Sequence, residues 1–359
     1  MNYEYTTPLQ TVSMSQLYET VYHPKPPLIE GLLYPGTYLF VGAPKLGKSF
    51  FMAQIAYHIS TGAPLWEYPV RQGDVLYLAL EDDYRRLQDR LYRMFGTDCT
   101  EHLHLAVAAM RLGDGLHEQM QSFLLQYPNT SLIIIDTLQK VRAACSDTCS
   151  YANDYEVITT LKHFADAHGI CLLLVHHTRK QQSDDRFDMI SGTNGLLGAA
   201  DGAFLLHKEK RIGCTAVLEI SGRDQQDQKL HLNRNPDTLL WELDHADMET
   251  WHEQPDPVLI AVSKFITSAN SEWIGAPTDL VNLLSLNMRP NTLSLKLNVN
   301  AGRLLNDYHI LYESNRTHDG RRIHLRLLPK RVDGDGRDDL FEGAQKTVTV
   351  DTTDTGVSP

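Results

Sequence analysis

The sequence predicts an α/β protein with a mostly parallel central sheet and a small second domain. Between residues 37 and 243, short apolar runs alternate with amphipathic stretches of helical length. This alternation is typical of strand–helix–strand units with right-handed crossovers. A polar, acidic segment at 245–257 separates this region from a shorter one. A chain of 359 residues has room for about two such domains.

The predicted strands of the larger region are short and continuously apolar, as expected for strands that are covered on both faces. In chain order these runs are 38–41, 75–80, 132–135, 171–175 and 202–206. The helical stretches between them are 48–60, 83–95, 115–126 and 153–168. Three antiparallel strands are expected to follow, at 215–220, 229–233 and 239–243. We therefore expect a core domain at 28–245, preceded by an irregular arm at 1–27 whose last residues are rich in proline.

The region 257–330 has the pattern of a small helical domain that ends in a β-hairpin. Residues 257–267 are amphipathic, and further helical pieces are expected up to residue 307. Two strand-like runs then flank Asp319-Gly320, a dipeptide typical of hairpin turns. Three helices followed by a hairpin predict a winged helix. A linker at 246–256 and a tail at 331–359, which is rich in Asp, Gly and Thr and expected to be disordered, complete the organisation.

The charge of the chain is acidic but unevenly distributed. Lys and Arg number 33 against 45 Asp and Glu, a net charge of −12, which argues against coating nucleic acid with the whole surface. Residues 255–332, however, carry ten Lys or Arg against six Asp or Glu. Arg316, Arg321 and Arg322 cluster at the predicted hairpin, as expected for contacts to DNA phosphates. Docking of another protein is the alternative use of this basic domain.

The sequence has no feature of an exported or membrane-bound protein. No apolar run approaches the roughly 20 residues of a membrane helix. The first residues lack the basic and apolar segments of a secretory signal. The five cysteines include no CxxC pair. We therefore expect a cytoplasmic protein with reduced thiols and no membrane partner.

The strongest motif is GAPKLGKS at residues 42–49, which matches G-x-x-x-x-G-K-[ST] in full. A predicted strand enters it and a predicted helix leaves it. Glycines let the backbone amides curl around a phosphate, and the helix N-terminus adds positive potential. Lys48 is expected to reach the β- and γ-phosphates of ATP, and the Ser49 hydroxyl to bind Mg²⁺. The expected nucleotide contacts are Gly42, Ala43, Pro44, Lys45, Leu46, Gly47, Lys48, Ser49 and Phe50.

Two carboxylates follow other predicted strands and are candidates for the metal and the base. Asp136 comes directly after the run at 132–135, at the strand end where ligands bind in open α/β sheets. It is expected to hold Mg²⁺, on a strand neighbouring the phosphate strand. Glu81 follows the run at 75–80, which we also expect beside the phosphate strand, and is the candidate base that activates water. Capping of the next helix is the alternative role of Glu81, and Asp83 is the better cap.

The ordered set of motifs resembles RecA-fold ATPases, and within them the RepA-like hexameric helicases of plasmids and mobile elements. The residues that carry the resemblance are 29–33 with the loop 42–49, YLALED at 77–82, VHHTRK at 175–180, and SG at 191–192 followed by GAAD at 198–201 and SGRD at 221–224. They lie between residues 28 and 243. The domain at 257–330 has no counterpart in the compact plasmid helicase.

The resemblance implies roles for individual residues. Glu81 is similar to the catalytic glutamate of the family, and His176 and His177 to the position that senses the γ-phosphate, although one of the two is expected to be a packed core residue. Arg223 resembles the arginine that each subunit supplies to its neighbour's nucleotide, with an ion pair to Asp224 as the alternative and Lys208, Lys210 and Arg211 as rivals. The loop 178–190 would line the channel of a ring and contact single-stranded DNA through Arg179 and Lys180, although its acidic residues nearly cancel its basic ones.

These inferences predict a Mg²⁺-dependent ATP hydrolase that acts on DNA as a homo-oligomer, a hexameric ring by resemblance. Strand separation during replication of a plasmid or mobile element is the expected task. An ATP-dependent switch that assembles a DNA-bound regulator is the alternative. A phosphotransferase is disfavoured because the sequence has no separate arginine-rich lid or acceptor pocket.

Overall fold

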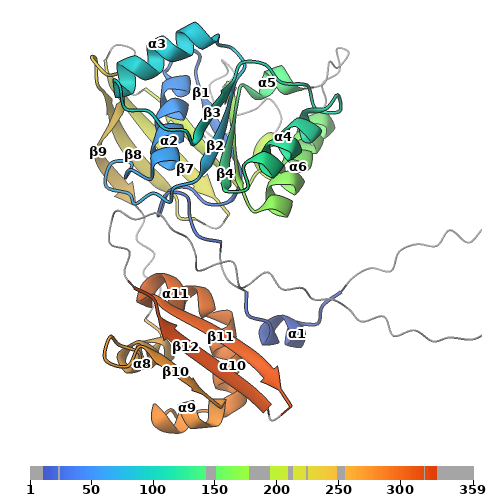
Figure 1. The fold of residues 1–359 in the computed structure, drawn as a ribbon, viewed down its shortest axis with the longest axis vertical. Coiled ribbons are helices and arrows are strands. Elements are labelled where there is room, and N and C mark those ends of the chain that lie inside the picture. The colour runs from blue at the N-terminus through green and yellow to red at the C-terminus, as the bar shows by residue number, and fades with distance from the viewer. Residues whose placement is uncertain are drawn as a thin grey trace, which may run out of the picture. The chain divides into compact units, whose positions relative to one another are not determined.

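A nine-stranded sheet forms the centre of the larger of two units in the computed structural model (Figure 1). The structure describes residues 11–22, 25–142, 151–177, 195–208, 213–223, 225–248, 255–318 and 320–329. The described residues from 25 to 248 form the larger unit. Those from 255 onward form the smaller one, together with residues 11–22.

The sheet confirms the predicted α/β class, because its first six strands are parallel and its last three continue antiparallel. Its order is β3-β2-β4-β5-β1-β6-β7-β8-β9. The strands are β1 (Gly36–Gly42), β2 (Asp74–Ala79), β3 (Leu103–Ala106), β4 (Thr130–Asp136), β5 (Cys171–His177), β6 (Gly202–His207), β7 (Thr215–Gly222), β8 (Gln228–Arg234) and β9 (Trp241–Met248). All eight strands predicted in this region are present. The last of them, β9, extends into the segment expected to be a linker.

Two features of the sheet differ from expectation. The sequence does not predict the edge strand β3, whose four residues are only half-buried, so it lacks the continuous apolar run of the central strands. The strand order also separates β1 from β4 by β5, and from β2 by both β5 and β4. The expectation that Asp136 and Glu81 leave strands adjoining the phosphate strand is therefore wrong. The strands that pair with β1 are β5 and β6.

Helices cover both faces of the parallel part of the sheet and explain its apolar runs. In β4, Leu132 and Ile134 pack into one core and Ile133 and Ile135 into the other, all fully buried. Each such side chain contributes about 1.5–3 kcal/mol through burial. The first core lies under α2 (Lys48–Thr61) and α3 (Tyr84–Phe95) (Figure 1). The second lies under α4 (Leu116–Gln126), α5 (Leu138–Val141), α6 (Tyr151–His168) and α7 (Gly195–Ala199). No helix of the described residues is long and apolar enough to span a membrane.

The smaller unit packs helices against a three-stranded antiparallel sheet of order β10-β12-β11. Its elements are α1 (Met14–Glu19), α8 (Pro257–Phe265), β10 (Glu272–Gly275), α9 (Pro277–Leu283), α10 (Pro290–Val299), α11 (Ala301–Tyr308), β11 (Ile310–Thr317) and β12 (Gly320–Leu327). The predicted hairpin is present as β11 and β12, whereas the sequence does not predict β10.

The N-terminal helix α1 also differs from the irregular arm that the sequence predicts. Ser13 caps it by accepting a hydrogen bond from the Gln16 amide. The Asn298 side chain of α10 donates to the carbonyls of Tyr18 and Glu19, at 2.9 and 3.0 Å. A segment far from α10 in the sequence thus belongs to the smaller unit. The predicted tail at 331–359 lies outside the described residues.

Candidate active site

The phosphate-binding motif forms the connection between β1 and α2, as the sequence predicts. Gly47, with φ of 102°, is the N-cap of α2, and such a backbone conformation favours glycine. The amides of Phe50 and Phe51 donate to the Gly47 carbonyl, so those of Lys48 and Ser49 are the helix donors without an intrahelical acceptor. Ala43, Pro44 and Lys45 are exposed, whereas Leu46 is buried. The loop therefore presents amides at a helix N-terminus, the arrangement that binds phosphate.

Gly42, the first residue of the motif, also has a packing role. A Cβ atom at this position would lie 2.6 Å from the carbonyl oxygen of Leu206 on β6, which no side chain tolerates. The close approach of β1 and β6 thus requires glycine where the loop begins.

Lys48 is a buried cation that is held back against its own loop. Its Nζ donates to the carbonyls of Gly42 at 2.8 Å and Ala43 at 3.1 Å, and lies 2.9 Å from Nδ1 of His177. Burial lowers the pKa of Lys48 to about 8, although the charges of Asp136 and Glu81 oppose this shift. A triphosphate would supply this ammonium with an anionic partner in direct contact.

Asp136 ends β4 and is almost fully buried, at 4% exposure. The hydroxyl of Tyr77, on β2, donates to its Oδ2 at 2.9 Å. Burial raises the pKa of Asp136, and hydrogen bonds from Ser49 and Tyr77 act in the opposite direction. The structure therefore brings Asp136 and Ser49, the two expected Mg²⁺ ligands, together. It also shows that Tyr77 orients the carboxylate, a role that a tyrosine inside an apolar strand does not reveal by sequence.

Glu81 lies just beyond β2 and is exposed, next to the end of β4. The Thr137 hydroxyl donates to its Oε1 at 3.3 Å, and the Leu80 amide donates to the Asp136 carbonyl at 2.8 Å. The helix cap is a different acid, since Asp83 accepts from the Arg86 amide at 2.9 Å. Glu81 therefore does not serve as the cap and stands beside the metal-binding carboxylate with its side chain open to solvent.

The two histidines at the end of β5 lie on opposite faces of the sheet. His177 contacts Lys48, and burial together with the Lys48 charge lowers the pKa of His177. Burial, followed by the charge of Arg142, lowers the pKa of His176 to about 4, so this imidazole is neutral near pH 7. His177 is thus placed to respond to a change at the phosphate loop, whereas His176 lies near the Arg142–Asp154 ion pair.

Several predicted site residues lie away from this group or outside the described part. Arg223 follows β7, is exposed, and donates through Nη2 to the Gly198 carbonyl at 2.7 Å within its own chain. Lys208 donates to the Gly213 carbonyl. Asp224, Lys210, Arg211, and the loop residues Arg179 and Lys180 lie outside the described residues. In the smaller unit, β11 and β12 place Arg316 opposite Arg321 and Asn315 opposite Arg322, so the predicted arginine cluster forms.

Sequence reasoning missed an arginine beside the phosphate loop. The Arg234 guanidinium lies over the Phe50 ring at 4.3 Å, and that of Arg90 lies over the same ring at 4.8 Å. A Cβ on Gly47 would lie 3.2 Å from Nη1 of Arg234. Burial lowers the pKa of Arg234. Arg234 ends β8, far along the chain from the loop, and no sequence motif links it to the site.

The pKa of Lys48 predicts that nucleotide binding weakens as the pH rises. Bound phosphates favour the ammonium form, so the pKa of Lys48 rises on binding. Below about pH 8 the lysine is already charged, and above it binding must take up a proton. We therefore expect the affinity for Mg²⁺-ATP to fall from about pH 7 to pH 9, with net proton uptake measured by calorimetry in buffers of different ionisation enthalpy. An affinity that is constant over this range would contradict the assignment.

Comparisons with known proteins give a family for the region that holds this site. The AAA domain family matches residues 3–183, just over half of the chain, and curated proteins give no match. Among solved structures, one isolated ATPase domain is 14% identical, with 58% of this chain and 84% of that chain covered and a TM-score of 0.49. A DnaB-like replicative helicase, described with its interactions with primase, is 14% identical over 58% of this chain and 57% of that chain, with a TM-score of 0.48. The KaiC-like protein PH0186 from the hyperthermophilic archaeon Pyrococcus horikoshii OT3 is 16% identical over 63% of this chain and 100% of that chain, with a TM-score of 0.43.

The matched region contains β1 to β5, and with them the phosphate loop, Glu81, Asp136 and both histidines. Family membership and the geometry of the loop thus concern the same residues. The chain belongs to the AAA domain family and is a P-loop ATPase.

Proposed function

We propose that this protein is a Mg²⁺-dependent ATPase that acts on DNA, as a RepA-like helicase or replication protein of a plasmid or mobile element. The observation that carries the proposal is the meeting of the Lys48 ammonium, the Ser49 hydroxyl and the Asp136 carboxylate at the carboxyl end of the sheet. These three groups match the charge pattern of a metal-bound triphosphate.

The residues present fit both ATP and Mg²⁺. The free amides of Lys48 and Ser49 and the Lys48 ammonium suit the β- and γ-phosphates. Ser49 and Asp136 offer oxygen ligands, which Mg²⁺ prefers, and Tyr77 holds the carboxylate in place. When bound, Mg²⁺ neutralises charge on the phosphates.

Hydrolysis also needs a group that orients and deprotonates water. Glu81 is exposed, lies beside the end of β4, and is positioned by Thr137. A carboxylate at this place acts as general base toward the attacking water, and the nearby His177 reports the state of the phosphate loop through its contact with Lys48.

The complete site is proposed to need a second copy of the chain. Arg223 is exposed and uses Nη2 for a bond to the Gly198 carbonyl, so its guanidinium has further donors for a neighbouring subunit's nucleotide. An arginine supplied in trans stabilises the charge on the transferring phosphoryl group. The proposed assembly is therefore a homo-oligomer, a hexameric ring by analogy with the family that the sequence resembles.

DNA contact is proposed to involve the smaller unit. Its element order, α8-β10-α9-α10-α11-β11-β12, is that of a winged helix, and the hairpin carries Arg316, Arg321 and Arg322. Arg316 and Arg321 also line a polar cleft of about 410 Å³ with residues of the N-terminal segment. Glu19 lies 3.8 Å from Arg321 across this cleft, whereas Arg316 and Arg322 are exposed.

The DNA proposal predicts a specific response to charge removal. Arg316→Ala and Arg322→Ala should each weaken DNA binding and reduce the slope of log affinity against log salt by about 1, because each removes one phosphate contact. The matched control is Lys264→Ala, which removes an exposed cation from α8 instead of the hairpin. Fluorescence anisotropy with single- and double-stranded DNA measures both quantities. A salt slope that the hairpin variants leave at the wild-type value would refute hairpin contact.

The second candidate function, an ATP-dependent DNA-bound regulator, is favoured by the same hairpin. The two functions differ in how DNA affects turnover. DNA-stimulated ATP hydrolysis with strand displacement supports the helicase, whereas specific duplex binding with slow, unstimulated hydrolysis supports the regulator.

A further inference from the structure

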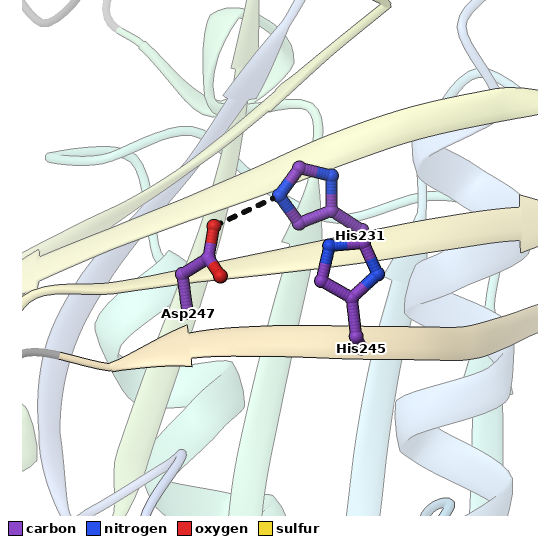
Figure 2. A group of neighbouring side chains, drawn as sticks. All are labelled: His231, His245 and Asp247. Carbon is purple, nitrogen blue, oxygen red and sulfur yellow. Dashed lines mark hydrogen bonds and ion pairs between the residues drawn. The ribbon is translucent and has the colours of Figure 1, made fainter.

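Three metal-ligating side chains converge on the β8–β9 hairpin, apart from the nucleotide site. His231 on β8 lies directly opposite His245 on β9, and Asp247 follows two residues later on the same face. Figure 2 shows the two imidazole rings side by side, with the Asp247 carboxylate directed at His231. One ligand atom from each residue lies within 4.8 Å of the other two.

The β-sheet register explains why these side chains meet. Leu230 and Leu232 of β8 face the core, so His231 between them points to the opposite face. The register shifts between His231 and Leu232, which are opposite His245 and Leu243. Asp244 is thus the extra residue of a bulge, and His245 and Asp247 lie on the face of His231.

The distances suit a single transition-metal ion. Nε2 of His231 lies 3.2 Å from Oδ2 of Asp247. Two ligands of a tetrahedral Zn²⁺ ion, with bonds of about 2.0–2.2 Å, are separated by roughly 3.3 Å. The rings of His231 and His245 are stacked, with centroids 4.1 Å apart and an interplanar angle of 9°. Side-chain rotations without backbone movement therefore suffice to direct three donors at one ion.

A second observation points to the same ligand. Nδ1 of His245 lies 2.7 Å from Oδ2 of Asp244, a distance at which the ring donates a hydrogen bond to the carboxylate. That bond keeps the proton on Nδ1 and leaves the lone pair on Nε2 for a metal. Metal-binding histidines in proteins almost always donate their other ring nitrogen in this way. Asp244 is therefore placed as an orienting residue behind a histidine ligand.

We propose that His231, His245 and Asp247 bind a divalent transition-metal ion, with Zn²⁺ as the best match. Imidazole nitrogens favour Zn²⁺, Ni²⁺ or Cu²⁺ over Mg²⁺ and Ca²⁺, which prefer oxygen ligands. Three protein ligands leave one position of a tetrahedral ion open. His245 and Asp247 are exposed, so water or a group from another molecule can fill that position. The ion would join the last strand of the sheet to its neighbour, at an edge that is otherwise held by one set of ladder hydrogen bonds.

Zinc titration of the full chain tests the site in excess Mg²⁺-nucleotide, which occupies the phosphate site. His245→Ala and His231→Ala should each weaken the binding measured by calorimetry at least about tenfold. The matched control is His102→Ala, because His102 also lies 2.8 Å from a carboxylate, Asp74, and its side chain is 52% exposed against 54% for His245. Asp244→Asn should cause a smaller loss, since it perturbs orientation and removes no ligand.

Thermal unfolding provides a second readout that is independent of ATP hydrolysis. Binding to the folded state alone raises the unfolding temperature. Zn²⁺ should therefore stabilise the wild type and the His102→Ala variant, and this stabilisation should be lost in His231→Ala and His245→Ala. Equal zinc affinity and equal stabilisation in the wild type and the His245→Ala variant would overturn the proposal.

Discussion

Replacing Lys48 with alanine should reduce ATP hydrolysis by at least about 100-fold, the largest effect that we expect from a single substitution. Lys48 is the buried cation of the phosphate loop, and its hydrogen-bond partners among the described residues are two carbonyls and the His177 ring. Its charge is therefore available to the γ-phosphate, where negative charge develops during hydrolysis. A steady-state assay of phosphate release measures the effect.

Two controls separate this loss from unfolding. Lys140→Ala removes an exposed lysine from α5, close in sequence to Asp136, and should leave turnover at the wild-type rate. The unfolding temperature of Lys48→Ala should stay near that of the wild type, because burial already disfavours the charged form of Lys48 in the folded chain. If a folded Lys48→Ala protein hydrolyses ATP at the wild-type rate, the assignment of the phosphate site is wrong.

The parts of this site that can be read from the sequence are those that one short segment specifies. The loop at 42–49 is determined locally, because the glycines, the lysine and the helix N-terminus are close together in one segment. Asp136 could be found because its strand is buried on both faces and reads as an uninterrupted apolar run. The hairpin at 310–327 could be found because its turn contains Asp-Gly.

What the sequence could not provide depends on contacts between distant segments. Strand order follows from the packing of the crossovers, so nothing local reveals that β5 lies between β1 and β4. Tyr77 is one aromatic residue in an apolar strand until β2 and β4 pair and bring its hydroxyl to Asp136. Arg234 reaches Phe50 only because the antiparallel end of the sheet lies against the start of α2.

Replacing Glu81 with glutamine should preserve ATP binding and reduce hydrolysis by about 10²–10⁴-fold, the usual contribution of a general base. Glutamine retains a carbonyl oxygen, so the hydrogen bond from Thr137 to this side chain survives and only the basicity is lost. Asp83→Asn is the matched control. It neutralises an acid two residues away that caps α3, and asparagine caps a helix about as well as aspartate.

The binding measurement for Glu81→Gln has to be made near pH 7 to be interpretable. The negative charge of Glu81 raises the pKa of Lys48, which burial lowers to about 8. Removing that charge lowers the pKa of Lys48 further, so above pH 8 the variant would also bind ATP more weakly, for a reason unrelated to the base. At about pH 7 the ammonium is largely retained and the two effects separate. Unchanged affinity with lost turnover at this pH identifies Glu81 as the base, whereas turnover at the wild-type rate would assign that role to another residue.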